Sequence, residues 1–314
     1  MGFWEGKKIL VTGGAGFLGK HVVSELENIG VKKDNIIVPR VENCDLKIQK
    51  NCNKAVLGID IVIHLAANVG GIAYNLAKPA EIFYDNAAMA LNLIDASYRA
   101  GVCKFIGIGS ACEYPKLTPV PFSECDLWDG YPEESNGAYG LSKRMMLVQS
   151  QAYYKQYGFN AIHLLPTNMY GPGDNFDPNS SHVIPALIRR ISDAQNRNKS
   201  FIEVWGSGEA SREFLYVRDA AKAIILAAEK YDKPEPVNIG CGYEIKIKYL
   251  VTLVCRLMKF NGEVRWDTSR PDGQLRRSLD ISRAREGFGF RAATQIEEGL
   301  KETINYWDHN RLLK

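Results

Sequence analysis

The stretch VTGGAGFLG, residues 11–19, decides the fold of this chain. An apolar run precedes it and an amphipathic stretch follows it, so its glycines, among them Gly13, Gly16 and Gly19, are expected in a turn between a strand and a helix. Such glycines let backbone N–H groups approach a pyrophosphate closely, and the N-terminal end of the helix adds partial positive charge. The pattern therefore predicts a bound dinucleotide. The residues expected to hold it at this turn are Gly13, Gly16, Phe17, Leu18 and Gly19.

Outward from the turn, apolar β-branched runs alternate with helical stretches, which is typical of a parallel sheet covered on both faces. Strands are expected at 9–12, 36–38, 61–65, 105–109 and 162–165, and helices near 20–29, 86–100 and 139–157. This order predicts an α/β fold, namely a Rossmann-type doubly wound parallel sheet.

The rhythm changes after Pro166 to a loop rich in Gly, Pro, Asn and Ser, followed by mixed helical and strand-like segments. We expect residues 1–170 to bind the cofactor, and residues 213–240 to return to that domain. A smaller, interleaved α/β C-terminal domain, formed by 171–212 and 241–314, is expected to bind the substrate.

Composition excludes several classes of protein. With 46% hydrophobic and 24% charged residues the chain is globular, and 39 Lys and Arg against 36 Asp and Glu give a net charge of only +3. Neither a nucleic acid nor a membrane is therefore expected as a partner. No secretory signal and no bilayer-spanning apolar run is evident, and the seven cysteines lack a CxxC pair or zinc-ligand spacing. We expect a cytoplasmic protein with free thiols and no metal.

The type of dinucleotide depends on the residues after the second strand, IIVPR. An acidic side chain there would bind a ribose 2′-hydroxyl, whereas a basic one would neutralise a 2′-phosphate. Arg40 favours NADP(H), although NAD stays possible if Arg40 is only a solvated loop residue. Asp45 and Leu46, at the end of a third short strand or in a loop, could flank the adenine.

A second pattern pairs Tyr139 and Lys143 in AYGLSK, on one face of an expected helix. The ammonium is expected to lower the pKa of the phenol and so make it a usable acid or base. Together with Ser110, at the end of the strand IGIGS, this chain resembles the extended short-chain dehydrogenases/reductases. That resemblance implies that Ser110, Tyr139 and Lys143 are catalytic. Other residues expected to contact the cofactor are Leu65, Ala66, Ala67, Pro166 and Asn168, besides Tyr139 and Lys143.

A narrower resemblance rests on HLAANVGGI, GSACEYPK, PTNMYGPGDNF, NSSHVIPALIRR, WGSGEASREFLYV and RPDGQLRRSLD. Together these segments resemble the GDP-L-fucose synthase family, which converts GDP-4-keto-6-deoxy-mannose to GDP-fucose with NADPH. In that family a Cys and a His invert the centres beside the keto group, and Cys112 and His182 occupy these positions. The resemblance also implies a homodimer through the helices at 86–100 and 139–157. The residues expected to bind the GDP-sugar are Asn168, Val183, Arg190, Trp205 and Arg212.

The chemistry of this pair can be argued separately. Inversion beside a carbonyl needs one group that removes a proton from one face and another that returns one to the opposite face, and a thiolate and an imidazole suit these tasks. Without the resemblance, the simpler interpretation is that Cys112 is a buried thiol of the core and His182 is a surface imidazole. Because a carboxylate facing the site would oppose a thiolate, Glu113 is expected to point away from it.

Three other functions stay open. A GDP-mannose epimerase type of enzyme would invert centres without net reduction, although His182 argues against it because that enzyme usually uses Lys as the second group. An epimerase/reductase of a GDP-6-deoxy-heptose is another reading. A non-catalytic NADP-sensing protein on the same fold is the least favoured.

Overall fold

The computed structural model describes residues 2–178, 180–269 and 274–311. Its centre is a six-stranded sheet in the order β10-β5-β4-β3-β1-β2, in which all neighbouring strands are parallel. The strands are β1 (Ile9–Thr12), β2 (Ile36–Ile37), β3 (Ile61–His64), β4 (Lys104–Ile108), β5 (Ala161–Pro166) and β10 (Val237–Ile239). The Rossmann-type fold is thus confirmed, and the ends of the five strands expected from the sequence differ by at most one residue.

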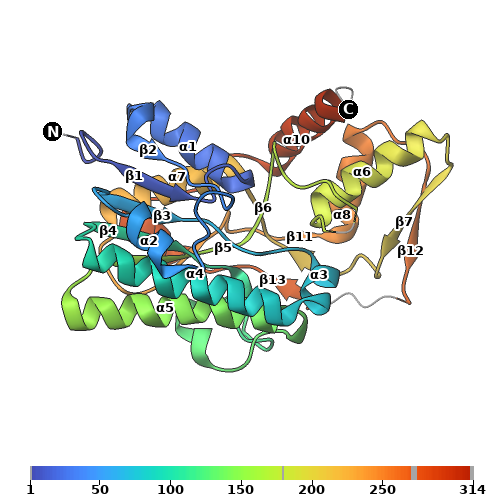
Figure 1. Cartoon of the computed structure of the whole chain (residues 1–314). Helices are drawn as coiled ribbons and strands as arrows, with labels where there is room; N and C mark the ends of the chain where they lie inside the picture. Colours follow the sequence, from blue (N-terminus) through green and yellow to red (C-terminus); the bar gives the residue numbers. More distant parts are fainter. Residues whose placement is uncertain (1, 179, 270–273, 312–314) are drawn as a thin grey trace.

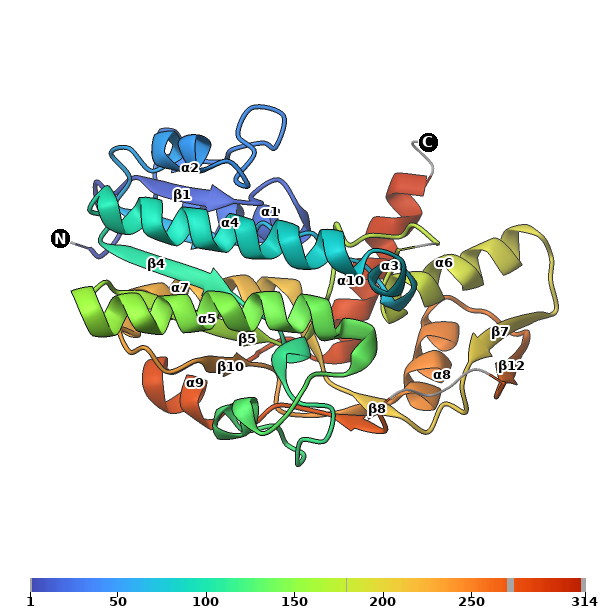
Figure 2. The same cartoon turned by 60° about the horizontal axis from the view of Figure 1, so that its bottom comes forward.

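Helices cover both faces of this sheet (Figures 1 and 2). Leu10, Val62 and Phe105 turn to one face, whereas Ile9 and Ile61, their neighbours in the chain, turn to the other. Because both sets are buried, the strands read as continuous apolar runs. The first face packs against α2 (Gln49–Ala55), α4 (Pro79–Arg99) and α5 (Gly137–Tyr157), and the second against α1 (Phe17–Asn28), α7 (Val217–Lys230) and α9 (Ser282–Phe288).

Two helices begin earlier than the sequence predicted. Helix α1 starts at Phe17 rather than near residue 20, because the glycine turn leads directly into it with Gly16 as N-cap. Helix α4 starts at Pro79 rather than near residue 86. A proline is tolerated in the first turn of a helix because its missing N–H would have no intrahelical partner there.

A second group of elements lies beyond the carboxyl ends of the sheet strands and is called the C-terminal lobe below (Figure 1). Its buried side chains, among them Ile188, Val204, Val254 and Ile304, form a separate cluster. Its helices are α6 (Val183–Asn196), α8 (Ile247–Leu257) and α10 (Ile296–Arg311). It has a two-stranded sheet, in which β7 (Phe201–Trp205) pairs with β12 (Glu263–Asp267). It also has a three-stranded sheet, in which β8 (Ser211–Arg212) lies between β11 (Ile245–Lys246) and β13 (Arg276–Arg277).

The chain passes between the sheet and this lobe more than once. After β5, β6 (Asn168–Tyr170) pairs with β9 (Phe214–Tyr216), and α7 and β10 then return to the main sheet. Two of the sequence segments quoted above extend into residue 179 and residues 270–273, which lie outside the described residues. In the described ranges, no helix is long and apolar enough to cross a membrane.

Packing on the α4 face gives a direct test of the fold. Leu93 is fully buried against the sheet, whereas 71% of Leu57 is exposed. We expect Leu93→Ala to lower the free energy of unfolding by about 2–5 kcal/mol, because it removes buried methyl groups and leaves a cavity. Leu57→Ala should change it by less than about 0.5 kcal/mol. Urea denaturation measures both, and equal losses would contradict this packing.

Candidate functional site

The carboxyl ends of β1, β3, β4 and β5 meet at one edge of the sheet, where a cavity of about 700 Å³ opens. Ligands of open α/β sheets bind at such an edge. His182, the N-cap residue of α6, contributes to the wall from the C-terminal lobe. The predicted site residues that line this cavity are Gly13, Gly16, Phe17, Leu18, Gly19, Arg40, Asp45, Leu46, Leu65, Ala66, Ala67, Ser110, Cys112, Tyr139, Lys143, Pro166, Asn168 and His182.

The glycine turn is shaped so that only glycine fits at its two critical positions. Gly13 has a φ of +69°, and a Cβ added there would lie 2.8 Å from the backbone nitrogen of Ala66. A Cβ on Gly19 would overlap the carbonyl oxygen of Gly13. The start of α1 is therefore packed directly on the turn, and the backbone is bare toward the cavity. This cradle fits the diphosphate of a dinucleotide.

The far end of the cavity carries charged side chains of both signs. Arg40 follows β2 and is exposed, with its Nε 3.9 Å from a carboxylate oxygen of Glu42. Asp45 and Leu46 lie in a turn, so the third short strand considered from the sequence does not form. The Asp45 carboxylate accepts the backbone N–H of Lys47 at 3.0 Å, a local bond that stabilises a turn and competes with strand pairing.

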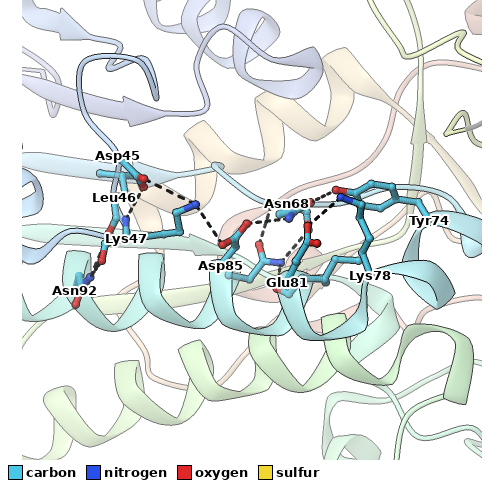
Figure 3. A network of polar contacts seen from close by, with 11 residues as sticks. Asp45, Leu46, Lys47, Asn68, Tyr74, Lys78, Glu81, Asp85 and Asn92 are labelled. Atoms are coloured by element: carbon cyan, nitrogen blue, oxygen red, sulfur yellow. Dashed lines mark hydrogen bonds and ion pairs between the residues drawn. The ribbon is translucent and has the colours of Figure 1, made fainter.

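A polar network ties this turn to the loop after β3 (Figure 3). Lys47 Nζ lies 3.3 Å from Asp85 on α4, and Asp85 in turn accepts the side-chain amide of Asn68 at 2.9 Å. The Tyr74 hydroxyl donates to the Asn68 side-chain oxygen at 2.9 Å. Lys47, Asn68 and Asp85 all line the cavity. None was selected from the sequence, although Asn68 lies within the quoted segment HLAANVGGI.

The turn after β4 presents Ser110 and Cys112 to the cavity. Ser110 caps a short 3₁₀ helix, and its Oγ accepts the backbone N–H of Cys112 at 3.1 Å. The Glu113 carboxylate accepts the backbone N–H of Ser110 at 2.8 Å and lies 3.1 Å from His163 Nε2. Both Glu113 and His163 are fully buried. Glu113 thus points into the core, as expected, and holds the turn from behind.

Helix α5 places Tyr139 and Lys143 on the cavity wall, both buried. The expectation that Lys143 lowers the pKa of Tyr139 is wrong for this structure. Burial raises the pKa of Tyr139, and the nearby Cys112 and Glu113 add to that shift. Burial also lowers the pKa of Lys143 to about 8, although Glu113 partly opposes this. Lys143 Nζ donates to the carbonyl of Ile108 at 2.9 Å, so its charge is directed at the backbone and the phenol stays protonated at neutral pH.

Cys112 and His182 reach the same cavity from distant parts of the chain. His182 is exposed to the open cleft, yet crowding by the walls lowers the pKa of its imidazole through desolvation. A further cation that the sequence did not reveal lies beside the thiol, since Arg277 Nη1 is 3.9 Å from Cys112 Sγ. These two residues are 165 positions apart, and only the fold brings them together.

The other residues predicted to bind substrate lie in the C-terminal lobe, outside the lining of this cavity. Val183 opens α6, and Trp205, 62% exposed, ends β7. Arg190 donates to the carbonyl of Glu203 and borders a separate cavity of about 310 Å³ between α6 and β7. Arg212 lies in β8. Within the described residues, no three His, Cys, Asp or Glu side chains form a group suited to a metal ion.

The chain matches a known protein family over most of its length. The model of the NAD dependent epimerase/dehydratase family matches residues 9–240. A GDP-L-fucose synthase of Sinorhizobium fredii is 40% identical over 308 residues, which cover 98% of this chain and 97% of the relative.

Two solved structures of GDP-sugar enzymes have a similar fold over almost the whole chain. A GDP-L-fucose synthetase of Naegleria fowleri bound to NADP has 30% identity and a TM-score of 0.90, over 99% of this chain and 96% of that one. A GDP-6-OMe-4-keto-L-xylo-heptose reductase from C. jejuni has 26% identity and a TM-score of 0.90, over 97% of this chain and 98% of that one.

The lowered pKa of Lys143 predicts how cofactor binding depends on pH. As the pH rises through about 8, the ammonium loses its proton and its attraction for an anionic dinucleotide. We expect the dissociation constant for NADPH to increase by about tenfold between about pH 7 and about pH 9. Fluorescence titration measures it. Lys143→Met should bind weakly with little dependence on pH, and a wild-type pH dependence in this variant would contradict the assignment.

Proposed function

Because this chain belongs to the NAD dependent epimerase/dehydratase family, and within it to the group of GDP-L-fucose synthases, we propose that it converts GDP-4-keto-6-deoxy-D-mannose into GDP-L-fucose. Carbons C3 and C5 are inverted and the ketone at C4 is reduced. The observation that carries this proposal is the cavity itself, since Ser110, Cys112, Tyr139, Lys143 and His182 all line it. A closely related GDP-4-keto-6-deoxy sugar would meet the same groups.

The cofactor is NADP(H), which supplies the hydride for the reduction when it is bound. The bare backbone at Gly13 and Gly19 fits its diphosphate, and the solved Naegleria relative is bound to NADP. Arg40, at the far end of the cavity, would neutralise the 2′-phosphate. Asp45 and Leu46, which line the same end of the cavity, would flank the adenine. Leu65, Ala66, Ala67, Pro166 and Asn168 complete the walls around the cofactor.

Tyr139 supplies the proton for reduction at C4. Its raised pKa keeps the hydroxyl protonated at neutral pH, so it donates a proton to the C4 oxygen as the oxygen gains negative charge. Ser110, at the end of β4, donates a hydrogen bond to the same oxygen. Lys143 would hold the ribose hydroxyls of the cofactor.

Cys112 and His182 carry out the inversions. A proton beside the ketone is acidic because the resulting enolate is delocalised, and the Cys112 thiolate removes it. His182 returns a proton to the opposite face. The position of His182 in the wall of the cavity that Cys112 also lines supports this assignment.

The C-terminal lobe binds the GDP portion in this proposal. Arg190 and Arg212 are assigned to the diphosphate, because a guanidinium donates paired hydrogen bonds to phosphate oxygens. Val183 and Trp205 lie beside the nucleotide, and Asn168 orients the sugar. This corresponds to a cofactor domain of residues 1–170 with 213–240, and a substrate domain of 171–212 and 241–314. The separate hydrophobic cluster of the lobe supports that division, except at α9, whose Ala284 and Phe288 pack against the main sheet.

A second candidate substrate is a GDP-linked 6-deoxy-heptose. The fold similarity to the C. jejuni GDP-6-OMe-4-keto-L-xylo-heptose reductase supports a GDP-linked heptose, since that structure and the fucose synthetase both have a TM-score of 0.90, at 26% and 30% identity. Both substrates carry the same GDP and 4-keto groups and differ at the far end of the sugar. Turnover of each substrate by the same preparation distinguishes them.

We further infer a homodimer formed through α4 and α5. Side chains of both helices leave large apolar groups exposed, among them Phe83, Leu91, Val148 and Tyr157. Exposed apolar side chains on two adjacent helices suit a subunit interface. A cytoplasmic location is also inferred, because the seven cysteines are free, as thiols are in a reducing compartment.

The test of this function is oxidation of NADPH with GDP-4-keto-6-deoxy-D-mannose as substrate. We expect one NADPH to be consumed per sugar converted, and the variant Tyr139→Phe to lower the rate at least about a hundredfold, because it removes only the proton donor. NADPH binding should persist in this variant.

Tyr249→Phe, at an exposed tyrosine of α8, is the matched control and should keep the full rate. Sugar inversion without loss of NADPH absorbance would identify a redox-neutral epimerase instead. Unchanged turnover in Tyr139→Phe would remove Tyr139 from its role. NADPH binding without turnover of either candidate sugar would favour a non-catalytic protein.

A further inference from the structure

Among the described residues, Arg277 places a cation beside the predicted base, with its Nη1 3.9 Å from Cys112 Sγ. We propose that Arg277 is a positioning residue that holds Cys112 as a thiolate. The proposal rests on the proposed function in one respect, namely that Cys112 is the base that removes the substrate proton. A thiol cannot accept that proton, whereas a thiolate accepts it and becomes a thiol.

The backbone of Arg277 is fixed by bonds that do not depend on its own side chain. Strand β13 pairs in parallel with β8, so that Arg277 lies opposite Arg212. The backbone N–H of Glu213 donates to the carbonyl of Arg277 at 3.1 Å, and the buried Glu213 carboxylate accepts the N–H of Leu279 at 2.7 Å. The strand that carries the guanidinium is therefore held on both sides of Arg277.

The guanidinium itself is oriented by a second contact. Arg277 Nε donates to the side-chain oxygen of Gln274 at 3.2 Å, which leaves Nη1 directed at the sulfur. Gln274 is held in turn by its amide, which donates to the carbonyl of Lys116 at 3.1 Å. Lys116 lies four residues after Cys112. The bond from Gln274 therefore ties the segment that carries Arg277 to the segment that carries the thiol.

The other charged groups around Cys112 are already engaged elsewhere. The Glu113 carboxylate faces Ser110 and His163 in the core, and Lys143 Nζ donates to the Ile108 carbonyl. Tyr139 is protonated at neutral pH because of its raised pKa. Arg277 is thus the cation that contacts the sulfur, and a cation beside a cysteine favours the thiolate.

The test uses alkylation of the native protein by iodoacetamide, which reacts with thiolates, followed by mass spectrometry. In Arg277→Gln, the rate at Cys112 should fall about tenfold at neutral pH. The matched control is Arg276→Gln, which removes the same charge one residue away, from an exposed side chain that binds Glu244. That variant should keep the wild-type rate, and so should the exposed Cys103 and Cys125 in every sample.

Two further measurements keep the test decisive. Arg277→Lys retains a positive charge and should keep the Cys112 rate within about threefold of wild type, even where the glutamine variant is unstable. Faster alkylation of the buried Cys52 and Cys255 would reveal unfolding. An unchanged Cys112 rate in Arg277→Gln overturns the proposal, and so does a lysine variant as slow as the glutamine one.

Failure of this proposal is distinguishable from failure of the proposed function, because alkylation requires no substrate. If Arg277→Gln slows alkylation but the wild-type protein does not turn over the keto-sugar, the contact stands and the function fails. If the keto-sugar is turned over and alkylation is unaffected, only the role of Arg277 fails. With both intact, Arg277→Gln should lower kcat for proton exchange more than it changes KM, because the guanidinium acts through the sulfur.

Discussion

Parallel pairing of β1, β3, β4 and β5 is the constraint on which the site depends. It brings the carboxyl ends of four strands to one edge, while helices on both faces leave that edge as the open side of the sheet. The glycine turn follows β1, the Ser110 turn follows β4, and Asn168 follows β5. Because strands in register end together, residues far apart in the sequence face one cavity.

Buried groups then determine the chemical state of the residues at this edge. Glu113 and His163 are fully buried and hold the Ser110 turn from the core. They pack so closely on Gly109 that a Cβ added there would overlap both side chains. Burial keeps Tyr139 protonated and lowers the pKa of Lys143 to about 8. A nearly neutral chain can therefore bind anionic ligands, because its cations are concentrated locally rather than spread over the surface.

Sequence patterns predicted five of the six strands of the central sheet to within one residue, since strands buried on both faces are continuous apolar runs. Helix starts were less visible, because Pro79 reads equally as a loop residue and as the first residue of α4. Charge effects were predicted least well. Spacing places Lys143 beside Tyr139, but it gives neither the burial of the phenol nor the carbonyl that Lys143 binds. Arg277 was missed because its contact with Cys112 spans 165 residues and has no local signal.

In the proposed reaction, one cavity performs both inversion and reduction. The most direct measurement is NMR of the product formed from GDP-4-keto-6-deoxy-D-mannose and NADPH in heavy water. We expect solvent deuterium at C3 and C5 and cofactor-derived protium at C4 of the same molecule. A product reduced at C4 that keeps protium at C3 and C5 would contradict it, because Cys112 and His182 would then have no part in the reaction.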